Sequence, residues 1–391
     1  MELTILWFVL IAILWIGYLV LEGFDFGVGM LMPILSRNKD KAKQDTERRL
    51  IINTIGPVWD GNEVWLITAG GATFAAFPEW YATLFSGFYI PLLLILLALI
   101  VRGVAFEYRG KINDDRWRAR CDQAIIFGSW IPAILWGVAF ANLVRGVELD
   151  AAHQYVGGFW ALLSPFALLG GLTTLVLFLL HGAVFIALKT DGEVRVKARR
   201  LAGYFSVAAV VVAGGWAVWA QVAYSVPWTW AAVVVAALAL VGVVIANAKA
   251  REGWAFLFSA LAILAATVLI FGSMYPDVMP AHDPANSLNI DNASSTQYTL
   301  TVMTWVAVIL VPVVLLYQSW TYWVFRRRLS TKDIPPPIGL SLKKIKDAAF
   351  GGPSSGSARS LDLTPAEDEK DTGTGAAPSG SGKRGPGDTS A

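Results

Sequence analysis

The heptapeptide Trp59–Trp65, WDGNEVW, places two carboxylates and an amide between two tryptophans. It lies within an apolar run over residues 51–76 that is long enough to span a bilayer as a helix. Charged side chains are costly inside a membrane, so they usually face a protein interior and mark a route for protons or substrates. Asp60 and Glu63 are three residues apart and share one face of a helix. We interpret the heptapeptide as a functional site, with local capping at a broken helix as the alternative.

The composition is that of a polytopic membrane protein. The chain has 391 residues, of which 55% are hydrophobic and only 15% are charged, with a mean hydropathy of +0.55. A soluble domain of this size is less apolar. The single cysteine, Cys121, excludes a disulfide within the chain and a thiolate metal cluster. Three histidines, His153, His181 and His282, limit the metal chemistry that the chain can support alone.

Nine apolar runs are each long enough to cross a bilayer as a helix. They cover residues 4–33, 51–76, 80–107, 122–145, 158–188, 202–224, 228–247, 254–275 and 298–325. The pattern predicts an all-α polytopic membrane protein with nine transmembrane helices.

Positive charge is concentrated in alternate connections between these runs. Twenty-five lysines and arginines lie in the connections 36–50, 109–120, 189–200, 249–251 and 326–346. None lies in the connections around 78–79, 146–157, 225–227 and 276–297. At the ends of the runs that meet these four connections, Arg145 is the only basic residue. Since cytoplasmic loops are enriched in Lys and Arg, we expect the N-terminus outside and the C-terminus in the cytoplasm.

The composition changes after Phe350 to mostly Gly, Ser, Pro, Ala and Thr. Such a segment has too few apolar side chains to form a core. We therefore expect a transmembrane domain over 1–346 and a disordered cytoplasmic tail over 347–391.

The first apolar run contains a second acidic pair, Glu22 and Asp25, again three residues apart. If the first helix ends and the second begins at the basic connection 36–50, Asp25 and Asp60 both lie roughly 15 Å from the cytoplasmic side. The four carboxylates of the two pairs would then meet at one level between neighbouring helices. Four negative charges cannot coexist there, so some must be protonated or paired, and Arg102 is the nearest basic candidate.

His181 is the only histidine within a predicted transmembrane helix. Ligation of haem by two histidines would need a partner at the same depth, and His153 and His282 belong to outer connections. Haem ligation with a methionine partner, a proton-relay or hydrogen-bonding role, and simple packing all remain open for His181. We expect this chain to bind no metal ion.

Several motifs together resemble subunit II of the bacterial cytochrome bd-type quinol oxidases. The matching segments are EGFDFGVG (22–29), ERR (47–49), WDGNEVWL (59–66), FEYRGK (106–111), GVAF (137–140) with Asn142, and HGA (181–183). The resemblance covers about residues 1–345, and its most specific motif is the heptapeptide. One departure is Glu22, where the family more often has an aspartate.

This resemblance implies two four-helix bundles plus one peripheral helix in the bacterial cell membrane. It implies a heterodimer with subunit I, which carries two haems b, one haem d and the quinol-oxidising loop. Small accessory subunits can also be part of such a complex. The complex oxidises quinol and reduces dioxygen to water, and this chain alone is expected to be inactive. Some members of the family also hold a structural quinone in subunit II. No nucleic-acid partner is expected.

The resemblance also suggests roles for individual residues. Asp60 matches a carboxylate of a proton route at the subunit interface, with Asp25 as its neighbour and Trp65 beside the oxygen path. We place Glu63 and Glu22 in the same route and His181 as a possible relay. Two other interpretations stay open: a proton-coupled secondary transporter using the same four acids, and a purely structural assembly subunit.

Overall fold

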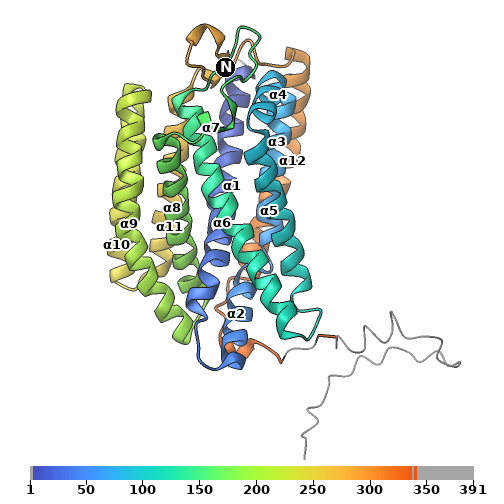
Figure 1. The fold of residues 1–391 in the computed structure, drawn as a ribbon, viewed down its shortest axis with the longest axis vertical. Helices are drawn as coiled ribbons and strands as arrows, with labels where there is room; N and C mark the ends of the chain where they lie inside the picture. The colour runs from blue at the N-terminus through green and yellow to red at the C-terminus, as the bar shows by residue number, and fades with distance from the viewer. Residues whose placement is uncertain (1–2, 337–338, 341–391) are drawn as a thin grey trace, which may run out of the picture. The chain divides into compact units, whose positions relative to one another are not determined.

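The computed structural model describes residues 3–336 and 339–340. Its longest helices pack side by side along one common direction, some neighbours antiparallel and others, such as α1 and α8, parallel (Figure 1). The helices are α1 (Leu3–Leu35), α2 (Lys41–Ile55), α3 (Trp59–Ala76), α4 (Pro78–Gly87), α5 (Tyr89–Tyr108), α6 (Asp115–Arg145), α7 (Gly158–Ala161), α8 (Pro165–Lys189), α9 (Gly192–Tyr224), α10 (Trp230–Ala248), α11 (Glu252–Met274) and α12 (Gln297–Val324). Two short strands, β1 (Asp277–Met279) and β2 (Leu288–Asn289), pair antiparallel between α11 and α12.

The predicted all-α membrane architecture is confirmed in its coarse form. Eight helices in the described part of the chain are long and apolar enough to cross a membrane. They are α1, α5, α6, α8, α9, the segment Pro227–Ala248 that contains α10, α11 and α12. The ninth predicted span does not meet this criterion. It corresponds to α3, which has 18 residues and carries the polar side chains of the heptapeptide.

Three of the predicted spans are interrupted rather than continuous. The run over 51–76 is divided between α2 and α3 at residues 56–58, where Pro57 lacks the backbone N–H that would continue the hydrogen bonding of α2. The run over 80–107 is divided between α4 and α5 at Phe88. The run over 158–188 forms the short α7 and then α8, which begins at Pro165 with the Ser164 side chain capping the Ala167 amide.

The connections sort to the two ends of the helices as their charge pattern predicts (Figure 1). At one end, the Leu329 amide donates to the Lys189 carbonyl at 2.8 Å, and the Leu340 amide donates to the Lys111 carbonyl at 2.9 Å. These basic connections therefore lie together. At the other end, the Val147 amide donates to the Pro280 carbonyl at 3.0 Å. The predicted disordered tail over 347–391 lies outside the described residues.

The first helix lies inside the bundle and organises its neighbours. α1 contacts α3, α6, α8 and α11, and 19 of its residues are buried. Its C-terminal half is buried almost completely from Glu22 to Met32. By contrast, α12 has one buried residue, Leu300, so most of its surface is exposed in this chain.

Candidate functional site: a buried polar cluster between α1, α3, α5 and α12

Close helix packing positions the acidic face of α1. A Cβ atom at Gly27 would lie 2.7 Å from the Cα atom of Gly182 on α8, which is closer than side chains tolerate. The glycine pair therefore permits the backbones of α1 and α8 to touch, as small residues do in membrane helices. With this face of α1 against α8, the Glu22 and Asp25 side chains are fully buried.

Glu22 forms a buried ion pair with Arg102 of α5. The Arg102 guanidinium also lies over two rings, with its central carbon 4.7 Å from the centroid of Phe26 and 5.2 Å from that of Phe106. Glu22 Oε2 and the Nε and Nη2 atoms of Arg102 have no hydrogen-bond partner among the described residues. The ion pair is thus buried, but several of its polar atoms lack a hydrogen-bond partner among the described residues.

Asp25 connects α1 to α3 and α12 through Asn62. The Asn62 amide nitrogen donates to Asp25 Oδ2 at 2.7 Å, while the Asn62 oxygen accepts from the Tyr322 hydroxyl at 2.7 Å. The second oxygen of Asp25, Oδ1, has no donor among the described residues. Asp25 and Asn62 are buried, so this chain of hydrogen bonds is protected from solvent.

Trp65 extends the same network toward α12. Its indole nitrogen donates to Gln318 Oε1 at 2.8 Å, and the Gln318 amide nitrogen lies 3.4 Å from the Asn62 oxygen. The Trp65 ring covers Gly17 of α1 so closely that a Cβ atom there would overlap it. The hydrogen bond and the glycine together hold the ring in one orientation.

The other two acids of the heptapeptide lie nearer the surface. Glu63 is half-buried, and its charge interacts with those of Glu22, Arg102 and Asp60. Asp60 is exposed, and its side chain makes no hydrogen bond or ion pair with any described residue. The structure therefore gathers Glu22, Asp25 and Glu63 near Arg102 and leaves Asp60 at the edge.

Asp60 does not lie inside a continuous helix, as the unbroken apolar run suggested. Because α3 begins at Trp59, Asp60 lies in its first helical turn. An acid there is favoured by the positive end of the helix dipole, but its side chain makes no capping hydrogen bond. Arg102 pairs with Glu22, one of the four acids for which it was the basic candidate, because α5 places the guanidinium against α1.

His181 of α8 is completely buried and uses both ring nitrogens. Nε2 lies 3.1 Å from the Val20 carbonyl oxygen, and Nδ1 lies 2.7 Å from the Ser259 hydroxyl. A carbonyl only accepts, so we assign the ring hydrogen to Nε2; the Ser259 hydroxyl beside Nδ1 also lies 2.9 Å from the Phe256 carbonyl oxygen. The ring also stacks on Phe256 with centroids 4.6 Å apart. Iron ligation would break one of these bonds, so the geometry fits a hydrogen-bonding role that ties α8 to α1 and α11.

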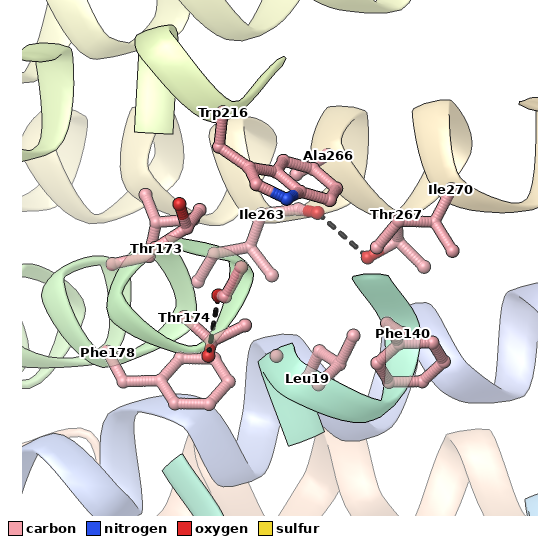
Figure 2. A pocket seen from close by; sticks show the side chains of 13 residues that line it. Leu19, Phe140, Thr173, Thr174, Phe178, Trp216, Ile263, Ala266, Thr267 and Ile270 are labelled. Atoms are coloured by element: carbon pink, nitrogen blue, oxygen red, sulfur yellow. Dashed lines mark hydrogen bonds between the residues drawn. The ribbon is translucent and has the colours of Figure 1, made fainter. Parts of the chain in front are cut away.

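Neither a cluster of metal-ligating side chains nor a large cavity is found where the described helices pack around His181. No group of three or more His, Cys, Asp or Glu side chains there could hold a metal ion. A cavity of about 30 Å³ lies between α1, α6, α8, α9 and α11 (Figure 2). It has room for about two water molecules and is far smaller than the pockets of several hundred Å³ that hold cofactors. Trp216 and Thr173 border it with side-chain polar atoms that lack partners among the described residues.

Three residues of the cluster were not predicted as site residues: Asn62, Gln318 and Tyr322. Asn62 belongs to the heptapeptide, but the sequence suggests roles there only for Asp60, Glu63 and Trp65. Gln318 and Tyr322 are four residues apart on an otherwise apolar helix, so they share one face. That spacing is a usable signal, although nothing in it indicates that the face meets Asn62.

Comparisons with known proteins identify the family and support the fold. Residues 3–325 match the family model described as cytochrome bd terminal oxidase subunit II. The chain is 39% identical to the cytochrome bd-I ubiquinol oxidase subunit 2 of Escherichia coli (strain K12), over 85% of this chain and 96% of the relative. It is 41% identical to the cytochrome bd ubiquinol oxidase subunit 2 of Bacillus subtilis (strain 168), over 84% of this chain and 97% of the relative.

A solved structure supports the fold independently. The bd oxidase from Geobacillus thermodenitrificans contains a chain that matches with a TM-score of 0.68 and 20% identity, covering 83% of this chain and 99% of that one. The eight long apolar helices and the bacterial relatives identify a multi-pass protein of the bacterial plasma membrane. The resemblance noted in the sequence is confirmed: the chain belongs to the cytochrome bd terminal oxidase subunit II family.

Proposed function

We propose that this chain is the subunit of a quinol-oxidising terminal oxidase that supports a haem-bearing partner and supplies its proton route. Family membership supports the assignment as an oxidase subunit, because the relatives in Escherichia coli and Bacillus subtilis are named as ubiquinol oxidase subunits. The test is co-expression with the partner subunit in a host that lacks its own quinol oxidases. Quinol-dependent oxygen consumption should appear only when both chains are present, and activity of either chain alone would contradict the proposal.

The haems are proposed to lie in the partner, subunit I. The support is the bonding of His181, whose two ring nitrogens are already engaged. In the complex the haems, two of type b and one of type d, would carry electrons from quinol to dioxygen. This chain would contribute no iron ligand, and its own residues would act on protons and on the position of the partner.

The isolated chain is therefore expected to show no Soret absorbance after purification from haem-replete cells. The co-expressed complex should show it at full intensity, and His181→Phe should leave the haem content of that complex unchanged. The measurement is a pyridine-haemochrome assay normalised to protein. A stoichiometric haem on the isolated chain, or loss of one haem in His181→Phe, would contradict the assignment.

The polar cluster is proposed to take up and release a proton. Glu22, Asp25 and Arg102 are buried together, and two carboxylates facing one guanidinium leave one negative charge unbalanced. A proton on either carboxyl group makes the cluster neutral. The unpartnered oxygens Glu22 Oε2 and Asp25 Oδ1 are the atoms available to hold it.

We propose that protons reach this cluster from the surface through Asp60 and Glu63. Asp60 is exposed at the start of α3, and Glu63 is half-buried one turn further along, within electrostatic range of Asp60 and Glu22. The order of burial therefore runs from Asp60 through Glu63 to Glu22. An exposed carboxylate beside transmembrane helices also favours a partner surface that covers it, since exposure to lipid would be costly.

We further propose α3 as a ninth membrane span within two four-helix bundles. α8, α9, α10 and α11 contact one another, α3 and α6 contact α1, and α5 contacts α6. The largely exposed α12 would be the peripheral helix. The short α3 can contribute a span because Asn62 and Trp65 direct their polar groups to α1 and α12, while the exposed Asp60 would be covered by the partner subunit.

The membrane orientation is expected to place the N-terminus outside. Reporter fusions after Ser36, Ile112 and Gly192 should read cytoplasmic, whereas fusions after His153 and Asn286 should read external. The reason is the concentration of lysine and arginine in the connections 36–50, 109–120 and 189–200, which contain the first three fusion sites. The measurement pairs alkaline phosphatase with green fluorescent protein at each site, and an external signal at Gly192 would overturn the orientation.

A further inference from the structure

The connections around 78–79, 146–157, 225–227 and 276–297 contain no lysine or arginine. At the helix ends that meet them, Arg145 is the only one. It ends α6, in the connection that we propose to lie outside. Charge asymmetry across a membrane disfavours arginine at this end, so its presence needs a local reason. The proton route does not use it.

Arg145 lines a pocket of about 260 Å³ at the end of the bundle where α6 ends and α8 begins. Figure 1 shows α7 at this end, between the two helices. The backbone around the pocket is held by hydrogen bonds. The Val156 amide donates to the Glu148 carbonyl at 3.0 Å, and the Tyr155 hydroxyl donates to the Gly158 carbonyl at 2.7 Å. The pocket is therefore part of the folded structure.

Two opposite charges face this pocket without meeting each other. Arg145 and Glu148 both line it, but no nitrogen of Arg145 comes within 4.0 Å of a Glu148 oxygen. Neither side chain forms an ion pair or a hydrogen bond with any residue that the structure describes. Gly146 (φ 84°) turns the chain at the end of α6 between the two residues, and the gap between their side chains suits a ligand that carries both charges.

The surroundings of the pocket are those of a membrane–water interface. Trp160 of α7 lines the pocket with 80% of its surface exposed. Tryptophan favours the level of lipid headgroups, because its ring is apolar and its N–H is polar. Leu162 and Leu163, in the connection between α7 and α8, add apolar surface to the lining of the pocket.

We propose that this pocket binds the headgroup of a zwitterionic phospholipid of the phosphoethanolamine type. The Arg145 guanidinium would donate to the phosphodiester oxygens, for which its planar group is suited. The primary ammonium would donate to the Glu148 carboxylate. The Trp160 ring and the two leucines would lie against the glycerol and the first acyl carbons. This site is separate from the proposed proton route, which lies between α1, α3, α5 and α12.

The charges exclude the common alternatives. An anionic headgroup such as phosphatidylglycerol would satisfy Arg145 but leave the Glu148 carboxylate unpaired beside another negative group. Phosphatidylcholine has a quaternary ammonium, which has no N–H to donate to Glu148. Only a headgroup with a phosphate and a protonated amine satisfies both side chains.

The test measures lipid binding to the delipidated complex of this chain with its partner subunit, by native mass spectrometry. Dioleoyl lipids with ethanolamine, choline and glycerol headgroups are titrated in parallel. We expect the ethanolamine lipid to bind roughly tenfold more tightly than the other two, as a charge-assisted hydrogen bond provides. Free phosphoethanolamine at the same concentration should not displace it. Equal binding of the three lipids, or displacement by the free headgroup, would overturn the proposal.

Two variants separate the roles of the charges. Arg145→Gln should lower the affinity for all three lipids. Glu148→Gln should lower the affinity for the ethanolamine lipid to that of the glycerol lipid, and the affinity for the glycerol lipid should stay the same or increase. Glu79→Gln and Arg251→Gln are matched controls, because both residues are exposed and lie away from the pocket. Unchanged headgroup preference in Glu148→Gln, with an intact haem spectrum, would refute the site.

Discussion

Arg102→Gln is expected to prevent accumulation of the assembled complex. Arg102 is almost completely buried and is the ion-pair partner of Glu22, so its loss leaves two buried carboxylates without a cation. Removing one partner of a buried ion pair costs about 3–5 kcal/mol, a large part of the roughly 5–15 kcal/mol that stabilises a folded protein. The substitution also removes the contacts of the guanidinium with Phe26 and Phe106. Yield of haem-containing complex and its melting temperature are the measurements.

A double variant distinguishes loss of the ion pair from loss of packing. Glu22→Gln together with Arg102→Gln removes both charges and should recover part of the yield that Arg102→Gln loses. Arg251→Gln, at an exposed position between α10 and α11, is the control and should behave as the unmodified chain. If Arg102→Gln assembles normally, the buried pair does not stabilise the structure. If the double variant is no better than the single one, packing and not charge is responsible.

Asp60→Asn is expected to leave assembly intact and to slow quinol-dependent oxygen consumption at least about tenfold. Asp60 is exposed and makes no side-chain contact with a described polar group, so asparagine disturbs little of this chain. The lost interaction with the helix dipole amounts to about 0.3–1 kcal/mol. Asparagine cannot accept and release a proton, however, and the reduction of each dioxygen to water consumes four protons. The rate should fall while haem content stays normal.

Glu79→Gln is the matched control for this variant. Glu79 is also an exposed acid in the first turn of a helix, α4, but α4 follows the other end of α3. Its substitution removes the same charge from the same kind of position and should not slow turnover. Normal oxygen consumption in Asp60→Asn would remove Asp60 from the proton route, and a loss of assembled complex would make its role structural.

The sequence alone was sufficient for the coarse fold and for the family. Apolar length is a property of contiguous residues, so eight of the nine predicted spans correspond to helices long and apolar enough to cross a membrane. The charge pattern predicted which connections share an end. The four acids and the heptapeptide are local motifs, and they identified the family without any knowledge of packing.

The helix breaks were only partly predictable. Pro57 and Pro165 are visible signals for the start of α3 and α8, but the hydropathy of the runs over 51–76 and 158–188 is continuous enough to hide them. For this reason the sequence did not show that Asp60 lies in the first turn of a new helix.

Only the tertiary structure decided which polar groups meet. Burial of apolar surface is non-directional, so it does not specify how each helix is rotated about its axis. Close packing does specify it: the contact of Gly27 with Gly182 turns Glu22 and Asp25 inward. Asn62 then meets Asp25 from α3, and Tyr322 reaches Asn62 across 260 residues of sequence. The same rotation leaves Asp60 facing outward, because a residue two positions before Asn62 lies on the other side of α3.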